Sequence, residues 1–213
     1  MAKFPNSPGA AALARITPAL RTLPTGTRLA RVYYSAGRHP MAWNGFRHFG
    51  PVNARWDHHL PGKSAKAQAQ ARGIYYSAGD AKTCLAETFQ GTRRIDRASQ
   101  APWLVVFETV AALQVLDLTG DFATRMGASM AIHSGSRARA RGWARDLYEA
   151  YGDAQGIQYS SSMNGGAPAF AFNERARKAP LFGAHPLFHR ALADDVMLDP
   201  LKHAAHTLGY ALR

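Results

Sequence analysis

Two arginines of the sequence, Arg31 and Arg55, carry the side chain best suited to holding a phosphate. Their planar guanidinium groups can each donate two parallel hydrogen bonds to phosphate or carboxylate oxygens. The sequence contains neither GxxxxGK[ST] nor a GxGxxG that follows a strand, so a bound nucleotide would have to be held mainly by side chains. Both arginines also have simpler interpretations. Arg31 could form an ion pair at a strand edge, and Arg55 could be a surface residue stacked on Trp56.

Glu87 and Ser161 could add a carboxylate and a hydroxyl to such a site. Glu87 lies in AKTCLAETFQ, where the apolar residues around it indicate that part of the turn is buried. Ser161 lies in YSSSMNGG, where a strand that runs into a glycine turn can present a hydroxyl and backbone N–H groups to a ligand. No GxSxG surrounds this serine, so a hydrolase-type nucleophile is not indicated. A solvated helix glutamate and a hydrogen-bonded turn serine are the simpler alternatives.

A metal site is not expected from the sequence. His58 and His59 are adjacent, which on a strand would point them to opposite sides, and the chain has no HExxH pattern. Cys84 is the only cysteine, so an intrachain disulfide and a cysteine-based zinc site are both impossible. These features fit a reducing compartment.

The elements that would position these side chains can be read from propensity and periodicity. Residues 28–34, RLARVYY, have the composition of a strand, on which Arg31 and Tyr33 share one face while Val32 and Tyr34 share the other. GIYYSA predicts a strand over 73–78, Gly79 and Asp80 a turn with a helix cap, and residues 81–90 a helix that carries Glu87.

The rest of the chain predicts further strands and one long helix. We expect strands at 101–110, 113–118, 156–161 and 170–174, a helix at 136–152, and a strand at 196–201 that Pro200 ends. Residues 35–72 have no sustained period and predict a long irregular connection. The sequence therefore predicts an α+β fold, with a mixed sheet core and surrounding helices, as an amino-terminal arm over 1–26 and a single domain over 27–213.

The charge of the chain predicts an anionic partner. Lys and Arg outnumber Asp and Glu by 26 to 14, which gives a formal charge of +12. Nucleic acid, a phosphate-bearing small molecule and an acidic protein are the three candidates. Part of the excess lies on the helix at 136–152, in Arg137, Arg139, Arg141 and Arg145. That run lacks interleaved aromatic residues, which favours a solvated or partner-binding face over a nucleic-acid site.

Hydropathy predicts a cytoplasmic protein. The first twenty residues are interrupted by prolines and lack the continuous apolar core of a signal peptide, and no later stretch reaches the ~20 apolar residues of a membrane span. A membrane partner is therefore not expected.

Four sequence pieces, taken in order, resemble the RES domain, a family named for its Arg, Glu and Ser. They are RVYY with Arg31, NARW with Arg55, GIYYSAGDAKTCLAETF with Tyr76 and Glu87, and GIQYSSSMNGG with Ser161. The resemblance covers residues 28–175. The strand, turn and helix around Glu87 form its strongest part. The chain departs from the pattern in its long loop between Arg31 and Arg55 and in its three consecutive serines, Ser160, Ser161 and Ser162, among which Ser161 is chosen because it follows Tyr159 by two residues.

The resemblance implies a fold similar to that of ADP-ribosyltransferases and a toxin of a bacterial toxin–antitoxin pair, with a cognate antitoxin as partner. Such toxins destroy NAD or transfer ADP-ribose to a protein, so NAD would be a substrate and no cofactor is expected. By this resemblance Glu87 and Arg31 are catalytic. Arg31 and Arg55 hold the pyrophosphate or an incoming phosphate, Tyr76 orients the nicotinamide or ribose, and Ser161 binds the nicotinamide end.

Two other functions stay open at this point. In the same fold, the chain could be an ADP-ribosyltransferase that modifies a protein. In another class, it could be a non-catalytic nucleic-acid-binding module that uses the arginines at 137–145. The acceptor of the ADP-ribosyl group could be water, inorganic phosphate or a protein side chain.

Overall fold

A large mixed sheet forms the centre of the computed structural model, which describes residues 3–178 and 181–213. Eight strands follow the order β1-β7-β8-β9-β4-β2-β6-β10, and β3 pairs with β4 beside this path. All the pairings are antiparallel except that of β7 with β8. The strands are β1 (Leu20–Leu23), β2 (Arg28–Tyr34), β3 (Arg47–Gly50), β4 (Gln68–Ala78), β6 (Pro102–Glu108), β7 (Leu113–Asp117), β8 (Gly156–Ser160), β9 (Pro168–Asn173) and β10 (Phe188–Ala191).

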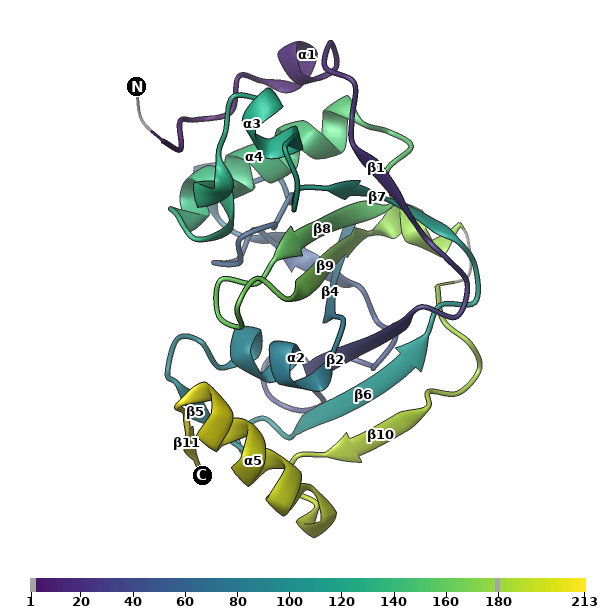
Figure 1. Ribbon diagram of the computed structural model, residues 1–213, viewed down its shortest axis with the longest axis vertical. Coiled ribbons are helices and arrows are strands. Elements are labelled where there is room, and N and C mark those ends of the chain that lie inside the picture. Colours follow the sequence, from purple (N-terminus) through teal and green to yellow (C-terminus); the bar gives the residue numbers. More distant parts are fainter. Residues whose placement is uncertain (1–2, 179–180) are drawn as a thin grey trace.

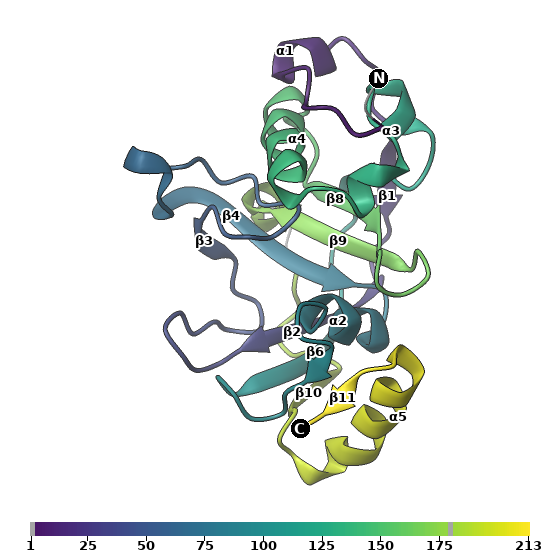
Figure 2. The ribbon, with the colours of Figure 1, turned by 90° about the vertical axis from the view of Figure 1, so that its left-hand side faces the viewer.

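Helices gather at both ends of this sheet (Figure 1). α1 and α4 pack together at one end and α5 lies at the other, beside a small parallel sheet of β5 and β11. Figure 2 shows α2 beside the ends of β2 and β4. The α+β fold predicted from the sequence is confirmed. The remaining elements are α1 (Ala10–Leu13), α2 (Ala81–Thr88), α3 (Phe122–Arg125), α4 (Arg137–Ala150), α5 (Leu198–Leu208), β5 (Arg94–Ile95), β11 (Ala211–Leu212) and the 3-10 turns η1 (Lys63–Ala65), η2 (Met130–His133), η3 (Glu174–Arg177) and η4 (Asp195–Met197).

The alternation of side chains along β2 separates two buried clusters. Ala30 belongs to the larger cluster, which includes residues of α2 and α4, whereas Leu29 belongs to a second, aromatic-rich cluster with Tyr75 and Phe107. The strand predicted over 28–34 has the bounds of β2, and its alternation is confirmed. This alternation decides which side chains can reach a site on the α2 side of the sheet.

The strand, turn and helix predicted around Glu87 are confirmed in β4 and α2. The Asp80 carboxylate accepts hydrogen bonds from the backbone N–H of Thr83 at 2.7 Å and from its hydroxyl at 2.7 Å, which caps the start of α2. Thr83, Cys84, Leu85 and Ala86 are buried, so α2 is fixed against the sheet on one side. Glu87, in the last turn, stays half-buried.

The strand predicted at 196–201 is wrong. These residues form η4 and the first turn of α5, with Pro200 inside that turn. Proline is tolerated there because the first N–H groups of a helix have no partner within the helix. Here the proline helps to begin a helix.

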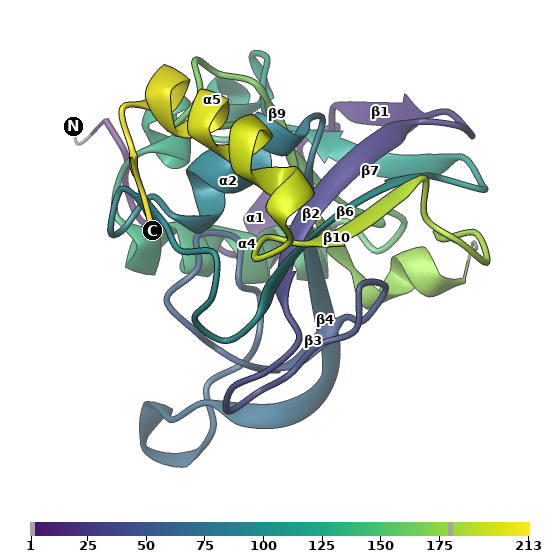
Figure 3. The same ribbon diagram turned by 90° about the horizontal axis from the view of Figure 1, so that it is seen from below.

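The predicted amino-terminal arm and the predicted irregular connection both contain strands. The expected amino-terminal arm supplies α1 and the edge strand β1, and Leu13 and Leu23 are buried. Residues 35–72 contain β3 and the first part of β4, which form a hairpin that projects from the body (Figure 3).

The last described residues brace α2. β11 pairs in parallel with β5, and the Tyr210 hydroxyl donates a hydrogen bond to the carbonyl of Ala86 at 3.1 Å. Ala86 directly precedes Glu87. Among the described residues, no helix has the length and apolar character needed to cross a membrane.

Candidate active site

A cavity of about 420 Å³ lies between the sheet, α2 and the first turn of α4. Its walls come from β2, the loop before β4, β4 itself, α2 and β8. Three of the residues predicted for a ligand site line it, together with others that the sequence did not single out. The polar and aromatic side chains at this wall include Arg55, Tyr76, Glu87, Gln90, Arg137 and Tyr159.

The carboxylate of Glu87 is held at both oxygens. Its Oε1 accepts a hydrogen bond from the Ser161 hydroxyl at 2.6 Å, and its Oε2 accepts one from Nε2 of Gln90 at 3.2 Å. A carboxylate held in this way has little freedom to rotate. It is therefore fixed at the wall of the cavity, and no cationic side chain of the described residues is bonded to it.

Ser161 is buried, with 2% of its surface exposed, in the turn after β8. Its oxygen accepts hydrogen bonds from the backbone N–H groups of Met163 and Asn164, both at 3.2 Å. Because these contacts use the acceptor side of the hydroxyl, its proton is free to be donated to Glu87. Ser160 and Ser162 make no hydrogen bond to Glu87, so among the three consecutive serines Ser161 is the one joined to the carboxylate.

Two arginines reach the cavity from different elements. Nη1 of Arg55 donates to the carbonyls of Gly135 at 2.7 Å and Ile132 at 3.3 Å, and Nη2 of Arg137 donates to Oε1 of Gln90 at 2.7 Å. Neither guanidinium has a carboxylate within ion-pair distance among the residues that the structure describes. Burial lowers the pKa of Arg55, and the positive charge of Arg137 lowers it further. The positive charge of these two arginines favours an anion in the cavity.

Tyr76 and Tyr159 supply neutral hydroxyls and flat apolar surface. Burial, followed by the negative charge of Asp57, raises the pKa of Tyr76, and its buried hydroxyl has no hydrogen-bond partner among the described residues. Burial and then the charge of Glu87 raise the pKa of Tyr159 well above its ordinary value. The Tyr159 ring packs on Trp56, with centroids 5.4 Å apart. The aromatic surface of this wall suits a planar ligand ring.

Two predicted ligand residues, Ser161 and Arg31, do not line the cavity; Ser161 contacts it through Glu87, whereas Arg31 lies on the other face of β2. The Arg31 guanidinium lies 4.0 Å from the centre of the Tyr75 ring and donates to the carbonyls of Gly45 at 2.9 Å and Trp43 at 3.4 Å. Because side chains alternate along β2, Arg31 lies on the face opposite Val32 and Tyr34, which line the cavity. The expected contact of Arg31 with a ligand in this cavity is therefore not seen.

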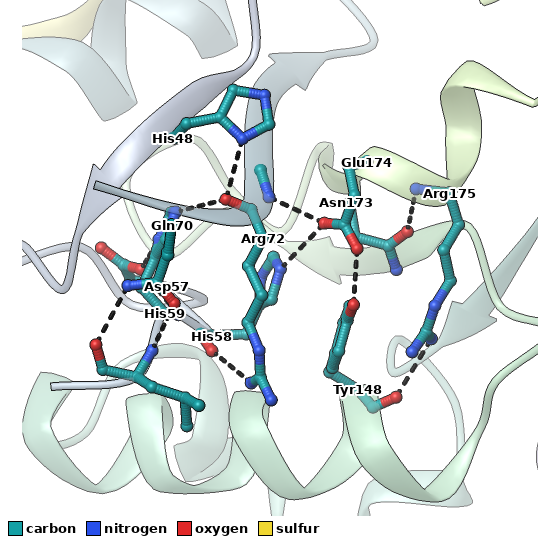
Figure 4. Close-up of polar contacts among 12 residues, drawn as sticks. His48, Asp57, His58, His59, Gln70, Arg72, Tyr148, Asn173, Glu174 and Arg175 are labelled. Carbon is teal, nitrogen blue, oxygen red and sulfur yellow. Dashed lines mark hydrogen bonds and ion pairs between the residues drawn. The ribbon is translucent and has the colours of Figure 1, made fainter. Parts of the chain in front are cut away.

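A buried polar network holds the loop that carries Arg55 and Trp56 (Figure 4). Oδ1 of Asp57 contacts Nδ1 of His59 at 2.5 Å, and its Oδ2 accepts hydrogen bonds from Arg47 at 3.0 Å and the backbone N–H of Val52 at 2.6 Å. Burial alone would raise the pKa of Asp57, but these partners hold it well below its usual range. The ionised carboxylate therefore anchors the loop directly after Trp56.

The same network continues through Glu174, where it joins η3 to α4 and β4 (Figure 4). Glu174 accepts hydrogen bonds from the Tyr148 hydroxyl at 2.5 Å and the Gly73 backbone N–H at 2.7 Å, and it lies 3.6 Å from Nε2 of His58. Burial opposes its ionisation, yet the neighbouring His58, Gly73 and Tyr148 lower its pKa to about 2. This part of the network is structural support outside the cavity.

His58 and His59 are not arranged as the sequence predicts. Their rings stack, with centroids 5.5 Å apart and planes 14° apart, because the chain here is a loop rather than a strand. Within residues 3–178 and 181–213, no group of three or more His, Cys, Asp or Glu side chains is placed to hold a metal ion.

Sequence reasoning missed Gln90, Arg137 and Tyr159. Arg137 belongs to the charged run interpreted as a solvated or partner-binding face, yet it is the first residue of α4 and turns into the cavity. Ser136 caps this helix by accepting from the N–H of Arg139, and a cap is a signal that the sequence does contain. No sequence signal tells that the first turn of this helix meets the end of α2.

Comparisons with known proteins agree with this fold. A search of curated proteins found no match. Among solved structures, a chain of the crystal structure of the M. tuberculosis MbcT–MbcA toxin–antitoxin complex is similar, with a TM-score of 0.55 and 15% sequence identity over 84% of this chain and 90% of that chain. The model of the RES domain family matches residues 28–194. Since this match spans most of the sequence and includes the cavity, the chain belongs to the RES domain family.

Proposed function

We propose that this chain cleaves the nicotinamide–ribose bond of NAD and acts as the toxin of a toxin–antitoxin pair. One observation carries the chemical part of the proposal. The Glu87 carboxylate, held by Ser161 at 2.6 Å, lines the same cavity as Arg55 and Arg137, two arginines without a carboxylate partner among the described residues. A carboxylate at one position and positive charge at another match a ligand that becomes cationic at its ribose and is anionic at its phosphates.

The reaction needs this distribution of charge. As the bond between nicotinamide and C1 of the ribose breaks, the electron pair leaves with nicotinamide, which departs as a neutral molecule. The ribose then acquires positive, oxocarbenium-like charge, and an acceptor oxygen forms the new bond to the same carbon. When the acceptor is water, its extra proton is released to solvent. A fixed carboxylate stabilises this charge more in the transition state than in the ground state.

Other residues then bind and orient the substrate. Arg55 holds the pyrophosphate or an incoming phosphate, and Tyr76 provides a ring surface that orients the nicotinamide or ribose. Ser161 orients the Glu87 carboxylate through its hydrogen bond, and both residues act at the nicotinamide end of the substrate. Arg31 acts from the other face of β2, where its contact with Tyr75 supports the strand that carries Tyr76.

The toxin role rests on family membership and on the similar fold found in a toxin–antitoxin complex. By the same inference, a cognate antitoxin is the expected protein partner. The alternative of a nucleic-acid-binding module is weakened by three arginines of the 137–145 run. Their guanidinium groups donate to other parts of the chain, Arg137 to Gln90, Arg139 to the Phe4 carbonyl and Arg141 to Asn53.

The test is incubation of the purified protein with NAD, with and without inorganic phosphate, followed by mass spectrometry of the products. We expect release of nicotinamide. ADP-ribose, ADP-ribose 1″-phosphate or a modified protein would then identify water, phosphate or a side chain as the acceptor. Intact NAD under all conditions would contradict the proposal. Binding to nucleic acid that weakens steeply with salt would then favour the binding module.

A further inference from the structure

We propose that Gln90 and Arg137 are positioning residues that fix the direction of the Glu87 carboxylate. The inference rests on the proposed function, because it concerns the same cavity. Neither residue was singled out for this role by its sequence context. Both line the cavity, and together they join α4 to the end of α2 through one line of hydrogen bonds.

The direction of these bonds follows from the chemistry of the side chains. A guanidinium can only donate, so the 2.7 Å contact from Nη2 of Arg137 requires the amide oxygen of Gln90. The amide NH₂ group must then point the other way, towards Oε2 of Glu87 at 3.2 Å. If Arg137 were absent, the Gln90 side chain would keep its contacts with Glu87 but would lose its anchor on α4.

Gln90 makes a second hydrogen bond to Glu87, at its backbone. Its Nε2 also donates to the backbone carbonyl of Glu87 at 2.7 Å. Carbonyls in the last turn of a helix lack partners within the helix, so this bond caps the end of α2 as well. Gln90 therefore contacts the backbone and the carboxylate of the same residue, and it fixes one relative to the other.

Ser161 completes the arrangement from the opposite side. Ser161 donates a hydrogen bond to Oε1 and Gln90 donates one to Oε2. The carboxylate is therefore bonded both to the turn after β8 and to the end of α2. A reaction that depends on a charge placed within a few tenths of an ångström is sensitive to the loss of either support. Arg137 acts through Gln90 rather than on the reacting atoms.

Steady-state kinetics of nicotinamide release from NAD would test the inference, with wild type, Gln90→Met, Arg137→Met and the double variant. We expect each single change to lower kcat by about 10- to 100-fold, because the orientation of Glu87 is lost. KM should stay nearly unchanged in Gln90→Met, whereas Arg137→Met also removes a positive charge from the cavity and should raise KM as well. The double variant should be about as slow as the slower single variant, since both residues act in series. Arg137→Lys, which keeps a donor and the charge, should retain more activity than Arg137→Met.

The matched control is Arg145→Met, which removes one positive charge from the same helix outside the cavity lining. It should leave kcat and KM unchanged. Thermal unfolding of every variant separates loss of fold from loss of orientation. If Gln90→Met does not fold, Gln90→Glu keeps the shape of the side chain and places an oxygen against Glu87, so it should also lower kcat.

The outcomes separate the two proposals. An inert wild type contradicts the proposed function itself. An active wild type with unchanged Gln90 and Arg137 variants overturns the positioning role and leaves the function intact. A rise in KM for Arg137→Met with an unchanged kcat would also overturn it, because the arginine would then bind the ligand rather than orient Gln90.

Discussion

The Ser161 hydroxyl donates a hydrogen bond to Oε1 of Glu87 across 2.6 Å, although the two residues are 74 positions apart in the chain. This contact joins the last turn of α2 to the turn after β8 and places both residues at one end of the sheet.

Glu87→Gln should preserve the fold and lose most of the NAD turnover. The amide has the same shape but lacks the charge that stabilises the ribose cation, and removal of one such electrostatic group lowers kcat by about 10²- to 10³-fold. Nicotinamide release measures the rate, and thermal unfolding checks the fold. Glu108→Gln removes a half-exposed carboxylate on β6 and is the control. Turnover at the wild-type level in Glu87→Gln would remove Glu87 from the mechanism.

Ser161→Ala should be much more harmful than Ser162→Ala. Ser161 is buried and bonded to Glu87, whereas Ser162 is exposed, so the adjacent serine is a close control. Loss of a hydrogen bond to a charged group is worth about 1.5–3 kcal/mol, and we expect a fall in kcat of about 10- to 100-fold. Equal activities of the two variants, measured by nicotinamide release, would argue against a role for the Ser161 contact.

Arg55 and Arg31 should respond differently to the same change. Arg55→Met removes positive charge from the cavity and should raise KM for NAD. Arg31→Met removes a buried stack on Tyr75 and two bonds to carbonyls on the other face, so we expect the free energy of unfolding to fall by about 2 kcal/mol. Denaturant unfolding and direct ligand titration separate these effects. Weaker NAD binding by a well-folded Arg31→Met protein would return Arg31 to the ligand site.

The network around Glu174 should make the protein less stable in acid. The pKa of Glu174 lies at about 2 in the folded protein, against an ordinary value of 4.5. A lowered pKa means that the unfolded state binds the proton first as the pH falls. The contribution of Glu174 is therefore fully present above about pH 4.5 and is lost as the pH falls towards about 2.

Glu174→Gln tests this dependence. The free energy of unfolding, measured in urea at a series of pH values, should be lower than that of wild type at neutral pH and should vary less between pH 4.5 and 2. Glu149→Gln, which changes an exposed carboxylate of α4, is the comparison. Parallel pH curves for wild type and Glu174→Gln would show that Glu174 does not contribute to the acid sensitivity.

Local signals were sufficient for much of the fold. The alternation in RLARVYY, the cap at Asp80 and the apolar run before residue 108 predict β2, α2 and β6 because each depends on neighbouring residues alone. The strand at 196–201 was predicted wrongly because Pro200 can either end a strand or begin a helix. Nothing local reveals that Leu20–Leu23 pairs with β7, because that pairing joins distant segments.

The candidate site, like the fold, contains residues that the sequence could predict and residues that it could not. Arg55, Tyr76, Glu87 and Ser161 are connected with one another only through the family resemblance, and the structure brings these four to one end of the sheet. Arg31 was expected with them, although the alternation of its own strand already places it on the face opposite Val32. Gln90 and Arg137 could not be found, because their roles depend on how two helices meet.

The support that β11 and Tyr210 give to α2 comes from residues that are synthesised after those of the cavity. Every residue of the cavity is synthesised by position 161, but the hydroxyl that bonds to Ala86 and the strand that pairs with β5 come from positions 210–212. A nascent chain that stalls before Tyr210 has all of the side chains of the cavity and lacks the support beneath the helix of Glu87. The proposed activity thereby depends on residues 210–212, and a translation product that ends before Tyr210 should cleave NAD poorly.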